Sequence, residues 1–365
     1  MTVMHHHYLD NIEQYVPGSA RKSLSENNID DIVKLSSNEN PFGSPLSPSS
    51  YNQLLSYIHE YPDLATSKLP SILSKKLGVS QSNIIYVNGS DELLQLISLA
   101  YLDTKSKILS IAHTFSQYKF MSQISGSKYH ELSLNINGYI NVDDLLEKII
   151  DQKIQCVCLA SPNNPTGVSF SFAEILRLLS SIPEDVLFVL DQAYIEFDEN
   201  YASWDIAKII SNFPNVLIMR TFSKAYGLAG ARIGYGIAND QICTILNKVK
   251  QPFNVNAFAI KAAEFALSNQ SFFQKTISNN FKQKQLLYES FNELGISYFK
   301  SSANFVCIKL PFDSKNFVNF LKKNYVLVRP LHSFGLPCYL RVSIGLDYQN
   351  QKFIDLLKEY LKNHV

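Results

Sequence analysis

Short apolar runs alternate with amphipathic stretches through the middle of the chain. The runs are rich in β-branched and aromatic residues and predict strands at 84–87, 107–111, 128–133, 154–160, 186–190, 216–220 and 232–237. The stretches between them carry apolar residues at helical spacing and predict helices at 92–102, 115–124, 142–150, 172–181 and 203–211. Strands separated by helices predict an α/β fold whose largely parallel sheet is covered by helices.

The segments before and after this alternation have different sequence patterns, and the chain is therefore predicted to form three units. Residues 1–45 are punctuated by Pro and Gly and form an expected N-terminal arm, which packs with a small C-terminal domain. Residues 46–256 form the expected large domain, which begins with helices at 51–60 and 66–77. Residues 257–365 form the expected small α+β domain, with a helical run over 257–294 that breaks near 268–270, strands at 303–309, 325–328 and 338–344, and helices at 313–323 and 349–362.

Composition excludes several classes of protein. The 365 residues are 46% hydrophobic and 18% charged, which is typical of one large or two ordinary globular domains. The formal net charge is +1, which does not favour nucleic-acid binding, and no apolar stretch reaches the roughly 18 residues of a membrane span. Five cysteines without a CxxC pair predict neither disulfides nor a metal site. With no signal-peptide pattern, we expect a cytoplasmic protein.

Four polar clusters directly follow predicted strands, where ligands bind in open α/β sheets. The segment 88–91, Asn-Gly-Ser-Asp, offers the backbone N–H groups of a helix start to an anion. A glycine turn followed by an ordinary helix cap explains the same residues. The segment 161–167, Ser-Pro-Asn-Asn-Pro-Thr-Gly, is either a rigid loop or a support that aims the Asn164 amide at a ligand.

The other two clusters contain charged side chains. Asp191 directly follows the strand at 186–190, where a buried carboxylate is costly unless it meets a positive partner; capping of the next helix is the alternative. The segment 221–232 holds Lys224 and, eight residues later, Arg232. This spacing beside Ser and Gly suits an amine nucleophile next to a phosphate-binding group. The glycine spacing is not GxGxxG, which argues against an NAD-dependent oxidoreductase.

Together these clusters resemble the fold-type I enzymes that use pyridoxal 5'-phosphate (PLP), and most closely the histidinol-phosphate aminotransferase family. The shared motifs run almost from end to end: Asn38-Glu39-Asn40-Pro41-Phe42-Gly43, Tyr61-Pro62-Asp63, the Gly89 turn, Asn164-Pro165-Thr166-Gly167, Asp191-Gln192-Ala193-Tyr194, Ser223-Lys224 to Arg232, and Leu340-Arg341-Val342. The resemblance implies an α/β fold with a mostly parallel seven-stranded sheet between helices, a smaller α+β domain, and PLP as cofactor.

The resemblance also implies roles for individual residues. Lys224 would be the catalytic residue, which binds PLP and moves the proton during transamination. Three groups of residues would bind the cofactor ring: Asp191 at the pyridinium nitrogen, Tyr194 and Asn164 at the phenolic oxygen, and Phe115 stacked on the ring. The phosphate would be surrounded by Ser90, Asp91, Ser223 and Arg232. Tyr61 would reach the cofactor phosphate in the neighbouring subunit of a homodimer.

Substrate recognition is implied by four further positions. Arg341 matches the arginine that receives a substrate carboxylate, Arg329 and Tyr15 match positions that bind the substrate phosphate, and Asn40 belongs to the first shared motif. The implied reaction is a transamination between L-histidinol phosphate and 2-oxoglutarate, or imidazole-acetol phosphate and glutamate, in histidine biosynthesis. One departure is Ala112-His113-Thr114 before Phe115, where relatives commonly carry a proline; for His113, a structural role and an effect on ring stacking are both open.

Three alternative functions are weighed against this interpretation. An aromatic amino-acid aminotransferase and a threonine-phosphate decarboxylase share the scaffold, and only the decarboxylase shares a phosphate-bearing substrate. Conversion of bound PLP by glutamate would separate a transaminase from a decarboxylase. A non-enzymatic PLP-binding regulator is disfavoured because such a protein carries a fused DNA-binding module, for which the near-neutral charge and the region before Asn38 give no sign.

Overall fold

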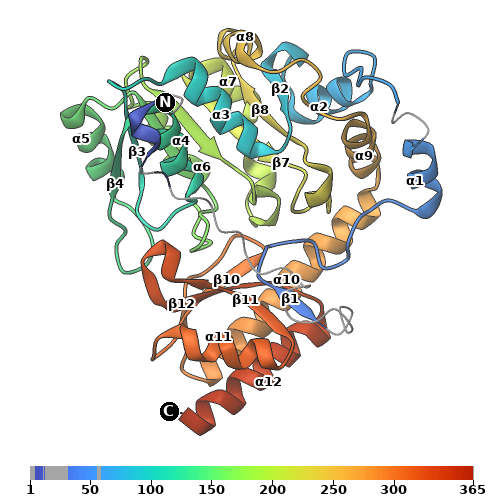
Figure 1. Cartoon of the computed structure of the whole chain (residues 1–365), viewed down its shortest axis with the longest axis vertical. Coiled ribbons are helices and arrows are strands. Elements are labelled where there is room, and N and C mark those ends of the chain that lie inside the picture. Colours follow the sequence, from blue (N-terminus) through green and yellow to red (C-terminus); the bar gives the residue numbers. More distant parts are fainter. Residues whose placement is uncertain (1–4, 11, 13–31, 56–58, 365) are drawn as a thin grey trace, which may run out of the picture.

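The computed structural model describes residues 5–10, 12, 32–55 and 59–364, which form two lobes (Figure 1). The large lobe is built on seven strands in the order β2-β8-β7-β6-β5-β3-β4. Their bounds are β2 Ile84–Val87, β3 Lys107–Ile111, β4 Lys128–Leu132, β5 Cys156–Ala160, β6 Leu187–Asp191, β7 Val216–Thr221 and β8 Gly234–Ala238. Only β8 runs antiparallel to its neighbours, so the predicted mostly parallel seven-stranded sheet is confirmed.

Helices cover both faces of this sheet. One face packs against α3 (Ser90–Tyr101), α4 (Gln117–Ser125) and α8 (Asp240–Val249). The opposite face packs against α2 (Leu69–Leu77), α5 (Val142–Gln152), α6 (Phe172–Leu179), α7 (Ile206–Asn212) and α9 (Ala257–Ser268). Because both faces are covered, every residue of β5, β6 and β7 is buried, and these strands read as nearly continuous apolar runs. The helix α1 (Pro48–Leu55) lies at the edge of the lobe in Figure 1.

The small lobe is built on a five-stranded sheet in the order β1-β11-β12-β10-β9. Its elements are β1 Val33–Leu35, β9 Ser297–Tyr298, β10 Phe305–Lys309, β11 Val326–Leu331, β12 Leu336–Ser343, α10 Gln270–Glu293, α11 Ser314–Lys323 and α12 Asp347–His364. The strand β1 pairs in parallel with β11, so a segment from the N-terminal part of the chain completes this sheet. The boundaries expected at 45/46 and 256/257 stay predictions.

A single asparagine separates α9 from α10, and the break predicted near 268–270 is confirmed. The backbone N–H of Asn269 donates to the Phe265 carbonyl and ends α9, while its side chain accepts from the Phe272 N–H and caps α10. The helix predicted over 51–60 instead begins at Pro48, and residues 59 and 60 lie outside it.

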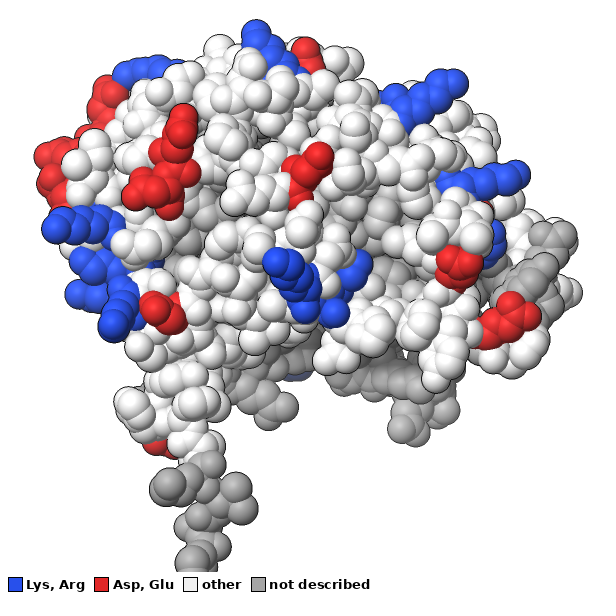
Figure 2. Space-filling view, turned by 90° about the horizontal axis from the view of Figure 1, so that it is seen from above, with Lys and Arg blue, Asp and Glu red and all other residues white. Residues whose placement is uncertain are grey.

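Several further features bear on the classes that composition excluded. The five cysteines are free thiols. No helix in the described part of the chain is long and apolar enough to cross a membrane. On the face that Figure 2 shows, acidic and basic side chains are interspersed and separated by uncharged surface. Short 3-10 helices occupy His7–Leu9, Gln81–Asn83, Ile195–Phe197, Tyr201–Ser203, Ala229–Ala231 and His332–Phe334, the last of which is η8.

The turn that follows Lys224 requires a glycine, and this requirement is testable. Gly227 has φ +66°, and a Cβ there would clash with the Gly43 carbonyl oxygen. We expect Gly227→Ala to lower the free energy of unfolding by about 1–3 kcal/mol through backbone strain, before the clash is counted. The matched control is Gly230→Ala, since a Cβ at that position meets nothing within 4 Å. Urea unfolding of both variants is the measurement, and equal stability would contradict the assignment.

Candidate active site

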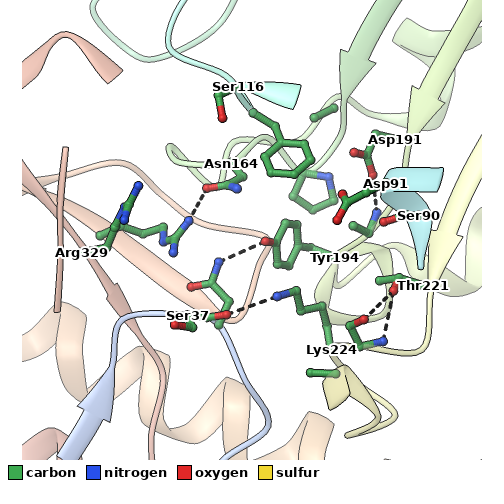
Figure 3. Close-up of a pocket in the computed structure, with 18 of the residues that line it drawn as sticks. Ser37, Ser90, Asp91, Ser116, Asn164, Asp191, Tyr194, Thr221, Lys224 and Arg329 are labelled. Atoms are coloured by element: carbon green, nitrogen blue, oxygen red, sulfur yellow. Dashed lines mark hydrogen bonds between the residues drawn. The ribbon is translucent and has the colours of Figure 1, made fainter. Parts of the chain in front are cut away.

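A cavity of about 460 Å³ lies at the carboxyl ends of the large-lobe strands (Figure 3). The loops after β2, β3, β5, β6 and β7 line one side of it, as expected for the ligand site of an open α/β sheet. The small-lobe strands β11 and β12 line another side, and the segment 36–39, which follows β1, completes the wall. Segments far apart in the sequence therefore meet around one cavity.

Eleven of the predicted site residues line this cavity: Ser90, Asp91, Phe115, Asn164, Asp191, Tyr194, Ser223, Lys224, Arg232, Arg329 and Arg341. Asn40 does not line it; its side-chain amide donates to the Ala225 carbonyl and to Thr276 Oγ1 at 3.1 Å each. Asn40 thus ties the segment after β1 to the backbone beside Lys224. Tyr61 is 80% exposed and stacks on Phe253, and Tyr15 lies outside the described residues.

Lys224 presents an amine with a lowered pKa to the centre of the cavity. It follows β7, and its Nζ donates to the Ser37 carbonyl at 3.2 Å (Figure 3). Burial, reinforced by the positive charge of Arg341, lowers the pKa of Lys224 from 10.5 to about 8. A substantial fraction of this amine is therefore neutral near pH 8, as a nucleophile or base requires.

Asp191 is a buried carboxylate that contacts no cation among the described residues. It ends β6 and is 6% exposed. Its Oδ2 accepts a 2.6 Å hydrogen bond from the Tyr118 hydroxyl, and its Oδ1 accepts from the Ala193 N–H at 2.9 Å. Burial raises the pKa of Asp191 from 3.8 to about 6, although the Tyr118 bond acts in the opposite direction. Such a carboxylate suits a ligand nitrogen that carries a proton.

Two neutral donors flank the space between these charged groups. The Asn164 side-chain oxygen accepts from Arg341 Nη1 at 2.5 Å, which leaves the Asn164 amide group to donate elsewhere. The Tyr194 hydroxyl accepts from Asn38 Nδ2 at 3.0 Å, so its own hydrogen stays available to a ligand oxygen. Both residues line the cavity, and Figure 3 shows Tyr194 beside the end of the Lys224 side chain.

An anion cup lies at the N-terminus of α3. The backbone N–H groups at Ser90 and Asp91 open this 12-residue helix, whose N-cap, Gly89, has φ +78° and no side chain. A Cβ at Gly89 would occupy the position of the Arg232 guanidinium. Arg232 also approaches Asp91 Oδ2 at 3.4 Å. The cup is thus formed by backbone N–H groups and a guanidinium rather than by the Asp91 carboxylate.

Two arginines face each other on the small-lobe wall. Arg329 on β11 is the register partner of Arg341 on β12, so the two side chains lie on the same face of the sheet. Arg341 is held by Asn164 and by the Ser36 carbonyl, which accepts from Nη2 at 2.8 Å. The Arg329 side chain makes no hydrogen bond or ion pair with the described residues, and it lies on the opposite side of the view from Asp191 in Figure 3. Adjacent like charges at a cavity wall favour a bound anion.

Tyr118 and Asn38 are site residues that sequence reasoning missed. Tyr118 lies on the first turn of α4, and a tyrosine in an otherwise polar helix start was the available signal. Asn38 was quoted only as part of a motif, yet it adopts φ +54° and is 1% exposed. No group of His, Cys, Asp or Glu within residues 5–10, 12, 32–55 and 59–364 is arranged as a metal site.

Comparison with known proteins identifies the class of enzyme to which this site belongs. The sequence model of the family "Aminotransferase class I and II" matches residues 30–357. The chain belongs to this family, so the prediction of an aminotransferase and its fold-type I architecture are confirmed.

The relatives are more specific. A histidinol-phosphate aminotransferase 2 of Oceanobacillus iheyensis is 38% identical over 96% of this chain and 97% of its own length. A histidinol-phosphate aminotransferase of Bacillus subtilis (strain 168) is 38% identical over 97% of this chain and 99% of its own length. A crystal structure of histidinol-phosphate aminotransferase from Sinorhizobium meliloti, in complex with pyridoxal-5'-phosphate, shares the fold at a TM-score of 0.87 over 100% of this chain and 99% of that one, at 23% identity.

The Tyr118 hydrogen bond predicts a pH-dependent stability. In Tyr118→Phe, the Asp191 oxygen loses its donor, which raises the pKa of Asp191 further above about 6. The charged carboxylate is then penalised above that pKa, and the penalty disappears as protonation occurs below it. We expect a loss of about 1–3 kcal/mol in the free energy of unfolding at pH 8 and a smaller loss at pH 5, measured without bound ligand.

Tyr86→Phe is the control for that measurement. The Tyr86 hydroxyl is also buried, but it has no hydrogen-bond partner among the described residues. Its removal is expected to change stability little and equally at both pH values. Equal losses at pH 5 and pH 8 in Tyr118→Phe would show that the hydroxyl does not act on the ionisation of Asp191.

Proposed function

We propose that the protein is a PLP-dependent histidinol-phosphate aminotransferase, which transfers an amino group between L-histidinol phosphate and 2-oxoglutarate in histidine biosynthesis. The observation that carries the proposal is the Arg329 guanidinium, which lies in the same cavity as Lys224 and makes no ion pair with the described residues. A substrate phosphate is the partner that this group lacks. The relatives that are 38% identical over nearly the full length carry the same function in their names.

The cavity fits PLP at each end. The buried Asp191 carboxylate would hold the pyridine nitrogen, Phe115 would stack on the ring, and the cup at Ser90, Ser223 and Arg232 would hold the phosphate. When bound, PLP supplies an electron sink for the substrate carbon that bears the amine. Asn164 and Tyr194 would donate to the ring oxygen from the Lys224 side.

Lys224 and Asp191 act on different protons in the proposed reaction. Lys224 Nζ, with its pKa lowered to about 8, binds the cofactor and then moves the proton at the reacting substrate carbon. Asp191 keeps a proton on the ring nitrogen, because the burial that penalises its own charge is relieved by that cation. Arg341, held by Asn164 and the Ser36 carbonyl, receives a carboxylate in the half-reaction of glutamate.

The proposal includes a cytoplasmic homodimer in which Tyr61 reaches the cofactor phosphate of the neighbouring subunit. An exposed aromatic pair supports this: Tyr61 is 80% exposed, Phe253 is 58% exposed, and their rings stack with centroids 4.7 Å apart. Such a pair is costly to leave in water and suits an interface. Tyr15 and Arg329 are proposed to bind the substrate phosphate, and Asn40 to support the Lys224 backbone.

A visible spectrum tests the proposed function. The purified protein with PLP should be yellow, should lose this colour on addition of L-histidinol phosphate, and should regain it with 2-oxoglutarate. Lys224→Ala should bind PLP yet lose the response. Bleaching with phenylalanine or tyrosine alone would identify an aromatic aminotransferase, and release of CO2 from O-phospho-L-threonine would identify a decarboxylase. No colour with PLP would overturn the assignment of Lys224.

Arg329 is expected to recognise the phosphate and nothing else of the amine substrate. Because a charge-assisted hydrogen bond contributes about 1.5–3 kcal/mol, Arg329→Gln should lower kcat/KM for L-histidinol phosphate by about 10- to 100-fold. The kcat/KM for L-histidinol, which lacks the phosphate, should change little. Arg177→Gln is the control, since that arginine pairs with Asp143 on the surface. Equal losses for both amines would contradict a phosphate role.

A further inference from the structure

His113 joins the two lobes at the wall of the cavity. It lies between β3 and α4 in the large lobe, and its Nδ1 is 2.6 Å from the Phe334 carbonyl oxygen in η8 of the small lobe. Because a carbonyl oxygen only accepts, Nδ1 carries the hydrogen and donates it. The ring also lies against Gly335, where a Cβ would be 3.6 Å from His113 Cε1. The contact therefore involves both a hydrogen bond and close packing.

The large-lobe end of this contact is rigidly held. His113 adopts φ +53°, a left-handed conformation that is unfavourable for an ordinary side chain. Its carbonyl accepts from Asn163 Nδ2 at 3.2 Å, and the neighbouring Thr114 hydroxyl donates to Asn163 Oδ1 at 2.7 Å. Asn163 is 1% exposed and belongs to the loop that carries Asn164. These hydrogen bonds hold His113 against the loop after β5.

The small-lobe end carries part of the cavity wall. Ser333 and Phe334 line the cavity on the same side as Arg329, and both belong to the connection between β11 and β12. Ser333 is exposed, Phe334 is half-buried, and the β11–β12 pairing shifts register at Pro330/Leu331, just before this connection. Among the described residues, the hydrogen bond from His113 is the one that joins this connection to the large lobe.

We propose that His113 is a positioning residue for substrate selection: it fixes the Ser333–Phe334 wall so that a phosphate held by Arg329 and the reacting carbon at Lys224 are accommodated together. The inference rests on the proposed function for the identity of the substrate. Phe115, two residues further on, has a support separate from His113, because its ring packs edge-on against Tyr118 with centroids 5.8 Å apart. Loss of the His113 ring should leave the cofactor end of the cavity unchanged.

Two substitutions separate the hydrogen bond from the backbone conformation. His113→Gly removes the ring and tolerates the positive φ. His113→Asn also tolerates it and places a side-chain N–H on Cγ, where the histidine carries Nδ1. In the holoenzyme, His113→Gly should accelerate amide exchange about tenfold in the peptide 331–338 and leave the peptide 216–224 unchanged. It should also raise KM for L-histidinol phosphate about 5- to 10-fold, with kcat and the cofactor spectrum preserved.

The outcomes decide the proposal. Rescue of both the exchange rate and KM by His113→Asn supports it, as does the absence of a further KM effect of His113→Gly in a Phe334→Ala background. Unchanged exchange in His113→Gly, faster exchange with an unchanged KM, or a shifted cofactor spectrum overturns it. If the wild-type protein does not react with L-histidinol phosphate, the proposed function fails instead. The exchange measurement, which needs no substrate, still decides whether His113 ties the wall.

Discussion

The site depends on one constraint: a carboxylate that is buried at the end of β6 and meets no cation in the part of the chain that the structure describes. Asp191 receives two hydrogen bonds, from Tyr118 and from the Ala193 backbone, and its pKa still rises to about 6 because burial outweighs them. Two neutral donors do not replace the hydration of a full charge. A protonated ligand nitrogen, as in the proposed function, would recover the remaining cost, so the fold would give up stability at this position in exchange for binding.

The same reasoning explains why the site is shared between two lobes. Arg329 and Arg341 are neighbours across β11 and β12, and their mutual repulsion would weaken a sheet that had to hold both without an anion. Arg341 is stabilised by the Asn164 oxygen and the Ser36 carbonyl, both of which come from outside those strands. The lobes are therefore joined through Arg341, a group that is also proposed to bind substrate. A ligand that engages the arginines strengthens the contact between the lobes by the same free energy.

The sequence was sufficient for the parts of the site that a general rule places. Residues that follow parallel strands must meet at one edge of the sheet, which is why the order of strands and helices along the chain is enough to group Asp191, Lys224 and Asn164. This rule does not place Tyr118, because its role depends on which face of α4 is turned toward the sheet and the end of β6. The rule does not place Phe334 either, because the connection between β11 and β12 meets the large lobe only through tertiary contacts. His113 lies in a segment that departs from the pattern of the relatives, but its hydrogen-bond partner, Phe334, lies 221 residues further along the chain.

A second buried charge, Arg220, ties β7 to the end of β6 between the strands that lead to Asp191 and Lys224. Arg220 is 2% exposed, and its Nε and Nη2 both donate to the Gln192 side-chain oxygen, at 3.0 and 2.8 Å. Gln192 directly follows Asp191, and Arg220 lies four residues before Lys224. Burial raises the pKa of the nearby Glu196 carboxyl to about 7, while the positive charge of Arg220 acts in the opposite direction. Buried charge pairs add little net stability, because desolvation offsets their attraction. The cluster instead fixes the register of the two strands. β6 cannot slide against β7 without breaking the two buried hydrogen bonds between Arg220 and Gln192, and these bonds lie close in sequence to both Asp191 and Lys224.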